Sequence, residues 1–521
     1  MKKPFSNSRR DFLKTGVSGL GYGLAMYLMP FPVGLFSSTA KAATKGKRQH
    51  LINIVDIGGW DTFWYYHFFD PALNSKNRLA PPTGWSDIGA KLRYGTNDGR
   101  LFPGSTQKIA PGMKFFTDTD LSRLSIWKGA SFLAGHGQNN FIFGGGTSPY
   151  NASYSSLISA YQADTRGQST LHYVKLSGSS QDFWVLPGML TGVAVPTCIP
   201  DQLTWGKLTS AASNPSMLMA DSVNSAVSAL GGLAKSHVTR PASQGVVQGF
   251  ASGYVSANFL STSNYASSDA FQQLWLRYFK AMKQEAVDQI ASGYGVIGDF
   301  KTEIKNALTP LSNFTVSTTA DLTTATSDFY ILSARNTAWL YAMSAFLVIN
   351  DLSAVVDLHP SGGDNHTGIS SDYLARMFGF VGFRELTRHL STVSNPDGGT
   401  MLDATLLTYT SEFDRTSIFI AETNGGWGTG HGTNFSAIIA GHKTNTGKIV
   451  GGVRMGDSTS IPVELRGIDG AVGTDPNTGA VTGGDPLNPK SLLPTVLQMF
   501  GVPVPAQQIT ECTAIPALIK S

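Results

Sequence analysis

Short runs of apolar, mostly β-branched residues alternate along this chain with longer stretches in which apolar residues recur every three or four positions. The first run, Leu51 to Ile57, leads into two glycines, as expected for a buried strand followed by a turn. Further strands are predicted at 121–132, 170–178, 352–359, 404–413 and 434–442, and helices at 373–393 and 491–502. This alternation predicts an α/β fold, with a largely parallel sheet flanked by helices.

The pattern changes between about residues 205 and 345, where helical spacing dominates and Ser/Thr-rich stretches separate the helices. The block lies between strand-and-helix segments of the same kind on both sides. We therefore expect a helical insertion or cap inside one domain that spans 43–521, and not a second domain. No internal repeat is visible.

The first 42 residues are expected to be an export signal. "NSRRDFLKTG" matches the twin-arginine pattern S-R-R-x-F-L-K through Arg9, Arg10, Phe12, Leu13 and Lys14. A modestly apolar stretch and the cleavage motif "AKA" follow. A membrane anchor is the alternative, but glycines and two prolines in the run favour cleavage before Ala43. The sequence thus predicts a periplasmic protein without a stable membrane span, with the twin-arginine translocase as its partner during export.

Composition narrows the function classes. Hydrophobic residues make up 41% of the 521 residues, enough for a large core, whereas charged residues make up only 14%. The net charge is +4 and no basic run interleaves with aromatics, which argues against a nucleic-acid partner. The two cysteines, Cys198 and Cys512, are too few for a zinc–thiolate site, and they either pair in an oxidising compartment or stay free.

Acids and histidines follow the ends of several predicted strands. Ligands of open α/β sheets bind beyond the carboxyl ends of the strands, so these side chains are expected at one rim. A single such acid is more often a helix cap or turn residue, but several together favour a metal site. Oxygen and imidazole ligands suit one or two divalent ions, Zn, Mn, Mg or Ca. The expected ligands are Asp61, Asp364, His366, Glu412 and His431, with His136 near them.

Four segments carry a family resemblance: "LINIVDIGGWDT", "GGDNHTG", "TLLTYTSEFDRT" and "GTGHGTNFSAIIAGHKTNTGKIVGG". In this order they resemble the landmarks of a twin-arginine-exported family known as domain of unknown function 1501. That family is similar to the alkaline phosphatase-like superfamily of phosphatases, sulfatases and phosphomutases. The resemblance implies hydrolysis of a phosphate or sulfate ester, on a small molecule or a glycan. It also implies the ligand roles of the five residues named above, with Asp56 as the alternative to Asp61.

The chain departs from the family pattern at several positions. Phe413 stands in place of a strand-end histidine, Gly430 in place of an aspartate, Asp414 in place of a glycine and Gly135 in place of a serine. These departures favour a single-metal or emptied site over a two-metal site. The metal-dependent hydrolase and a degenerate, non-catalytic member, which binds a glycan, a metal or a partner in the envelope, both remain open.

The catalytic residues are not fixed by the resemblance. A nucleophile is expected at the helix start "TSPYNASYSS", where free backbone N–H groups suit an anionic substrate. Arg415 either grips a phosphate or sulfate or pairs with Glu412 or Asp414. Trp60 and Trp64 either pack or line a sugar-binding surface. The candidate catalytic residues are His136, Ser153 and Arg415, with Thr147 and Ser148 as further nucleophile candidates. His359, His389 and His442 are expected to be structural or surface residues.

Overall fold

A computed structural model describes part of the chain, in segments between residues 49 and 521. The described residues are 49–56, 58–60, 99–131, 139–146, 151–166, 173–177, 197–199, 269–292, 299–360, 369–421, 427–431, 434–455, 468–506, 508 and 510–521. Several predictions lie outside them, namely the 1–42 export signal, Asp61, Trp64, Gly135, His136, Thr147, Ser148, Asp364 and His366. For His431 and Gly430 the structure describes the backbone alone.

The described strands form one eight-stranded sheet in the order β12-β4-β11-β8-β1-β7-β5-β6. Seven of them run in the same direction, and β11 is antiparallel to both of its neighbours. The largely parallel sheet expected from the sequence is therefore confirmed. Its strands are β1 (His50–Asp56), β4 (Leu124–Ser131), β5 (Tyr173–Ser177), β6 (Thr197–Ile199), β7 (Val355–His359), β8 (Thr405–Ser411), β11 (Asn434–Gly441) and β12 (Lys448–Gly451).

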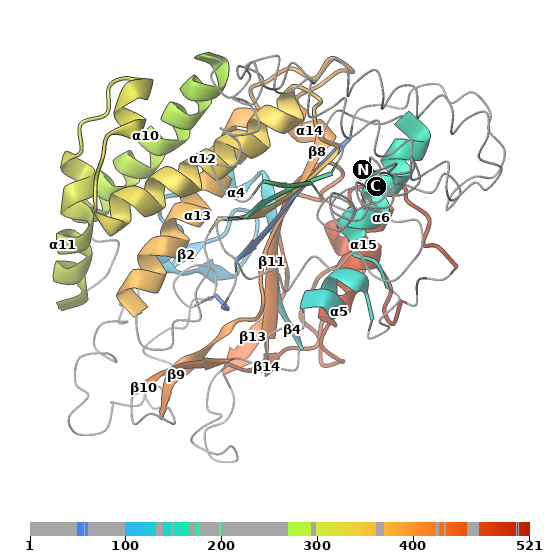
Figure 1. Cartoon of the computed structure of the whole chain (residues 1–521). Helices are drawn as coiled ribbons and strands as arrows, with labels where there is room; N and C mark the ends of the chain where they lie inside the picture. The colour runs from blue at the N-terminus through green and yellow to red at the C-terminus, as the bar shows by residue number, and fades with distance from the viewer. Residues whose placement is uncertain are drawn as a thin grey trace, which may run out of the picture.

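Three short two-stranded ribbons accompany the sheet. They pair β2 (Arg100–Leu101) with β3 (Lys108–Ile109), β9 (Arg415–Ala421) with β10 (Trp427–His431), and β13 (Val453–Met455) with β14 (Ile468–Ala471). Figure 1 shows the β9–β10 and β13–β14 ribbons together at one end of the large sheet, beyond β11 and β4.

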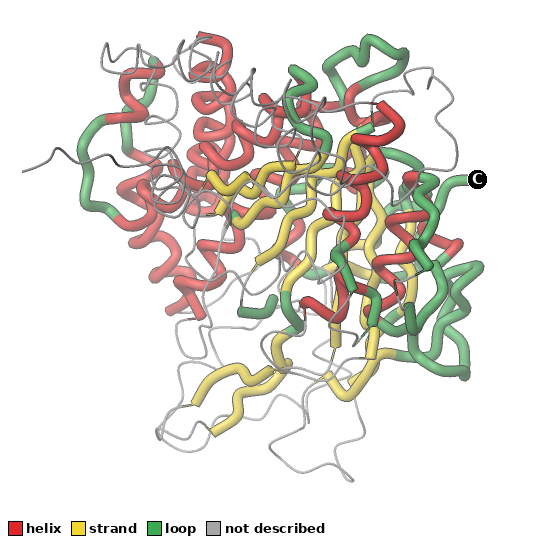
Figure 2. Tube along the Cα trace, turned by 45° about the vertical axis from the view of Figure 1, so that its right-hand side comes forward, coloured by secondary structure: helices red, strands yellow, loops and turns green. Residues whose placement is uncertain are grey.

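Helices cover both faces of the sheet (Figures 1 and 2). On one face lie α10 (Asp269–Ser292), α11 (Asp299–Asn313), α12 (Phe329–Ile349) and α13 (Ile369–Leu390). On the other lie α5 (Asn139–Gly144), α6 (Tyr154–Arg166) and α15 (Leu492–Phe500). The remaining short helices are α4 (Asp118–Leu121), α14 (Met401–Ala404), and the 3₁₀ turns η1 (Pro111–Met113), η6 (Thr319–Thr323), η8 (Pro489–Ser491) and η9 (Pro516–Leu518).

The burial of both faces of the central strand β1 explains why its sequence is an almost continuous apolar run. Ile52 and Ile54 belong to the core beneath α10, α12 and α13, whereas Leu51 and Val55 belong to the core beneath α6 and α15. Each face of β1 is therefore buried, and a strand buried on both faces needs no alternation of apolar and polar residues.

The described part of the helical block supplies a layer of the fold. Helix α12 is buried on nearly its whole circumference, and α10 and α12 share one core with the sheet. These helices therefore cover the face of the sheet itself. Whether the whole block at 205–345 is an insertion stays a prediction. None of the helices in the described ranges is long and apolar enough to cross a bilayer.

Candidate functional site

The sheet brings the predicted site segments to one edge. Strands β1, β4, β7 and β8 run in the same direction, so they all end at the same rim. The reversed strand β11 begins there, with Asn434 opposite Ser131, the last residue of β4. The described chain reaches this rim at the ends of β1, β4 and β7, which precede Asp61, His136 and the pair Asp364 and His366 in the sequence; these four residues lie outside the described ranges.

Glu412 connects the segment "LINIVDIGGWDT" with its own segment, "TLLTYTSEFDRT". It directly follows β8, and its Oε2 accepts a hydrogen bond of 2.9 Å from the backbone N–H of Gly58, 354 residues away in the sequence. Beside it, the Trp60 N–H donates to the Phe413 carbonyl at 2.9 Å, and the Arg415 N–H donates to the Trp60 carbonyl at 2.7 Å. The "GGW" and "EFDR" segments therefore run side by side at the rim.

The fourth landmark reaches the same place through the β9–β10 ribbon. Strand β10 pairs antiparallel with β9, and the backbone of His431 stands opposite that of Arg415. The backbone of His431 is thereby paired with a residue three positions after Glu412. The "GTGH" backbone thus lies beside the residue that follows "SEFD", and the meeting of the two sets of site side chains stays a prediction.

Asp56, the alternative first ligand, is occupied by other contacts. Its Oδ2 accepts hydrogen bonds from Trp60 Nε1 at 2.8 Å and from the Tyr409 hydroxyl at 2.6 Å, and it lies 3.7 Å from Nη1 of Arg376 on α13. Burial and then the Asp56 charge raise the pKa of Tyr409 well above its usual value, so that hydroxyl remains a donor. A fully buried carboxylate held by two donors and an arginine does not fit a metal ligand.

Phe413 fills the space beside the turn after β1. Gly59 has a φ of +79°, and a Cβ built there would approach Phe413 Cε2 to 2.3 Å. The guanidinium of Arg415 lies over the same ring, 5.6 Å from its centroid, and Arg415 is only 1% exposed. An apolar ring thus occupies the position at which the resemblance implies a histidine. The two functions considered for Arg415 stay predictions.

Asp414 is a titratable group that the sequence analysis considered as a departure from glycine and as a partner for Arg415, but not as an acid of the site. Its Oδ2 accepts from the Ser436 hydroxyl at 2.7 Å, and that hydroxyl accepts from the Gly129 N–H at 3.2 Å. Burial raises the pKa of Asp414 to about 7, against the smaller opposing effect of the Ser436 hydrogen bond. The rim therefore holds an acid that changes its charge near neutral pH.

Ser153 stabilises the start of α6. Its hydroxyl accepts from the Ser156 N–H and donates to the Ser156 hydroxyl, both at 3.2 Å. It is 6% exposed. These contacts are those of a helix cap, which is the plainer explanation for a serine at this position.

A second polar cluster lies inside the sheet, on the α6 side, and sequence reasoning missed it. Asp357 accepts from Asn53 Nδ2 at 3.0 Å, from the Ser155 hydroxyl at 2.7 Å and from the Tyr173 hydroxyl. Register places Lys175, Asp357, Asn53 and Thr408 in one row across β5, β7, β1 and β8. The sequence signal that could have revealed this cluster is a single polar residue inside an apolar run, Asn53 in β1 and Asp357 in β7.

This row contains a carboxyl group that burial affects strongly. Burial raises the pKa of Asp357, and the hydrogen bonds from Tyr173, Ser155 and Asn53 work in the opposite direction. Burial, with a smaller contribution from Lys175, lowers the pKa of His359 well below its usual value. His359 is therefore neutral at pH 7 and fits the structural role expected for it.

The predicted metal centre rests mainly on residues outside the described ranges. Among the described residues, no three histidine, cysteine, aspartate or glutamate side chains converge as a metal site. Glu412 is the one predicted ligand whose side chain is described, and its carboxylate is the right kind of donor for the expected ions. The ligand set as a whole stays a prediction.

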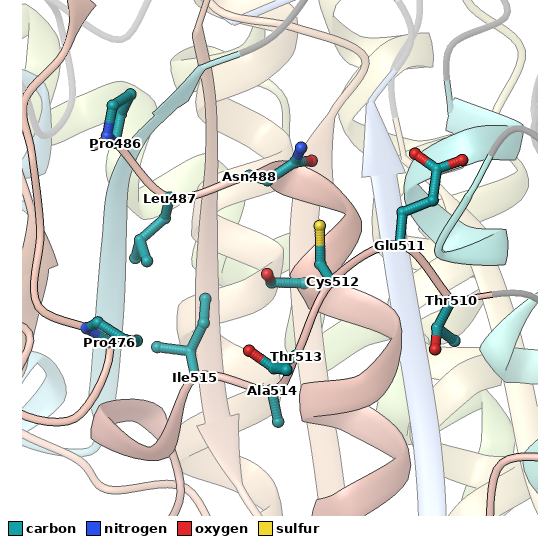
Figure 3. Close-up of a pocket in the computed structure, with 11 residues that line it drawn as sticks. Pro476, Pro486, Leu487, Asn488, Thr510, Glu511, Cys512, Thr513, Ala514 and Ile515 are labelled. Carbon is teal, nitrogen blue, oxygen red and sulfur yellow. The ribbon is translucent and has the colours of Figure 1, made fainter.

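Cys512 is a free thiol in this structure. It lies in the segment 510–515, which lines a cavity of about 460 Å³ together with residues around η8 (Figure 3). Burial raises the pKa of the Cys512 thiol, which makes it a poor nucleophile at neutral pH. The Cys198 side chain lies outside the described ranges.

Comparisons with known proteins add little to this geometry. No family model and no curated protein matches the sequence. One similar solved structure is titled "Crystal structure of Ps i-CgsB in complex with k-i-k-neocarrahexaose". The likeness covers 90% of this chain and 76% of that chain, at 10% identity and a TM-score of 0.33. A likeness at this level does not bear on the fold or the function of this chain.

Proposed function

We propose that the chain is an exported, periplasmic member of the alkaline phosphatase-like superfamily that hydrolyses a phosphate or sulfate ester at the rim of its sheet. The observation that carries the proposal is the Glu412–Gly58 hydrogen bond of 2.9 Å. It joins the segment before Asp61 to the segment after β8, as a shared site would require. The register of His431 with Arg415 supports the same meeting point.

In this proposal Asp61, Asp364, His366, Glu412 and His431 hold one or two divalent ions. Such an ion would polarise the ester oxygen and supply hydroxide near neutral pH. The protein supplies the rest: Gly58 orients the Glu412 carboxylate through its N–H, and Arg415 offers a cation to the ester anion.

A specific observation favours a second candidate, a protein that keeps the fold and binds its ligand without hydrolysis. Phe413 packs against Gly59, and Arg376 lies beside the carboxylate of Asp56. On the described side of the rim, an apolar ring and an arginine-paired acid thus take positions at which the hydrolases are expected to carry metal ligands.

One experiment on the exported protein separates the two candidates. The metal content of protein purified from the periplasm would be measured together with its turnover of aryl phosphate and aryl sulfate esters. His366→Ala and Glu412→Gln are the test variants, and Asp288→Asn, an exposed acid on α10, is the matched control.

The hydrolase predicts bound metal, and turnover that falls by about 100-fold or more in both test variants but not in the control. Stoichiometric metal without turnover, or neither metal nor turnover, would reject the hydrolase and leave the binding protein. Turnover unchanged in both variants would move the site away from the predicted ligands.

A further inference from the structure

A cavity of about 730 Å³ opens at the β4–β12 edge of the sheet. Its walls come from the turn between β2 and β3, from β4, from the end of β12 and from residues 472–481. Apolar side chains, among them Ile449, Val472 and Val481, form part of the lining, and Thr106 and Thr478 add hydroxyl groups. Ser105, Gln107 and Lys108 add further polar groups, so polar and apolar groups contribute about equally to the lining. A concave site of this size that offers both kinds of group suits a small molecule.

Lys128 is the charged residue from the sheet that lines this cavity. It lies on β4 at a bulge, where Lys128 and Gly129 stand opposite the single residue Ser436. Gly129 has a φ of +64°, which a glycine adopts without strain. The bulge explains how a lysine can leave the regular sheet and line the cavity.

The surroundings of Lys128 favour the neutral amine. The residue is 4% exposed, and its Nζ donates to the Lys108 carbonyl at 3.2 Å. No carboxylate of the described residues lies within ion-pair distance of that nitrogen. Burial alone lowers the pKa of Lys128 to about 7, so a large share of the amine is unprotonated at neutral pH.

We propose that this cavity binds a small aldehyde or ketone and that Lys128 takes up its carbonyl carbon as a Schiff base. The lone pair of Nζ forms the N–C bond, the carbonyl oxygen leaves as water, and the amine loses both protons to that water and keeps a C=N bond. Desolvated lysines are the form of this residue that carries out such chemistry. The proposal is independent of the ester site at the rim.

Reductive trapping tests the proposal on the full mature protein. Benzaldehyde is the probe, because its ring can pack against Ile449, Val472 and Val481 in the lining, and cyanoborohydride reduces any imine that forms at pH 7.5. Peptide mass spectrometry then compares the labelling rate of Lys128 with those of Lys108 and Lys448 in the same sample, which removes the need for a variant that must fold. Lys128→Met is added as a control, because it keeps the length of the side chain.

We expect Lys128 to be labelled at least about tenfold faster than the other two lysines, and its peptide to carry no label in Lys128→Met. Added acetone should slow the labelling of Lys128 by competition. Labelling of Lys128 at or below the rate of Lys108 would overturn the proposal, as would a rate that acetone leaves unchanged.

Discussion

Two carboxyl groups, Asp56 and Asp357, are fully buried on neighbouring strands of the same sheet, on opposite faces. Asp56 ends β1 on the face that α13 covers, and there Arg376 of that helix approaches it to 3.7 Å. Asp357 lies inside β7 on the α6 face, and its carboxylate accepts hydrogen bonds from an amide, a serine and a tyrosine. The same residue type is thus stabilised by a nearby arginine on one face, and on the other by neutral donors with a smaller contribution from the charge of Lys175.

The difference separates two ways of burying an acid. An arginine compensates the full negative charge of a buried carboxylate. When the arginine is removed, that charge is left without a partner in a medium of low dielectric constant. Burial raises the pKa of Asp357, and the three neutral donors and the more weakly acting Lys175 do not offset it, so the acid can take up a proton instead. The contribution of Asp56 to stability should therefore depend on Arg376, and the contribution of Asp357 should depend on pH.

The largest effect is expected from Arg376→Met. Loss of the cation leaves the buried Asp56 carboxylate without its arginine, and we expect the free energy of unfolding to fall by about 3–5 kcal/mol. Urea unfolding followed by circular dichroism measures the change. The double variant Asp56→Asn with Arg376→Met should recover much of the loss. A single-variant cost below about 1 kcal/mol would contradict the charge compensation on this face.

A smaller effect, with a distinct pH signature, is expected from Asp357→Asn. An amide cannot accept from all three donors, which should cost about 1–3 kcal/mol at pH 7. In the native chain Asp357 binds its proton more tightly when folded than when unfolded. Its contribution to stability is therefore largest at low pH and falls as the pH rises above about 4 toward the folded pKa.

The pH dependence can be isolated as a difference between two unfolding curves. Subtracting the Asp357→Asn curve from the wild-type curve between pH 4 and 8 cancels the other acids, Asp414 among them. The difference should decline with rising pH in that window. A flat or rising difference would mean that Asp357 is ionised throughout this pH window.

The smallest effect is expected from Tyr173→Phe, which removes one of the three donors to Asp357 and keeps the ring. We expect a loss of about 1 kcal/mol at pH 7, and a further rise in the pKa of Asp357. Thermal unfolding at two pH values measures both. The matched change on the other face, Tyr409→Phe, removes a donor to Asp56. Because Arg376 remains there, its cost should depend less on pH.

The architecture could be predicted because each central strand corresponds to a short, mostly apolar run of consecutive residues. Leu51 to Val55 and Val355 to Leu358 read as apolar runs, and each became a central strand. The position of Glu412 directly after β8 follows from the same reading.

The partners of the site residues could not be predicted, because they depend on register between distant segments. The contact of Glu412 with Gly58 spans 354 residues, and that of Asn53 with Asp357 spans 304. A strand shifted by one residue would turn Asn53 to the other face, and nothing in the local sequence fixes that choice. The raised pKa of Asp414 likewise depends on burial that only the assembled rim creates.

The reversed strand β11 has a consequence for how the rim can change over time. The other seven strands of the described sheet end at this edge. Strand β11 runs in the opposite direction and begins there, at Asn434. The stretch between β8 and β11 therefore begins and ends at the same edge, and its two ends are joined by the Asp414 N–H to the Asn434 carbonyl at 2.8 Å. Such a stretch can lengthen, shorten or be replaced without moving a single strand of the core. Relatives with the same sheet can thus carry different recognition surfaces above Glu412.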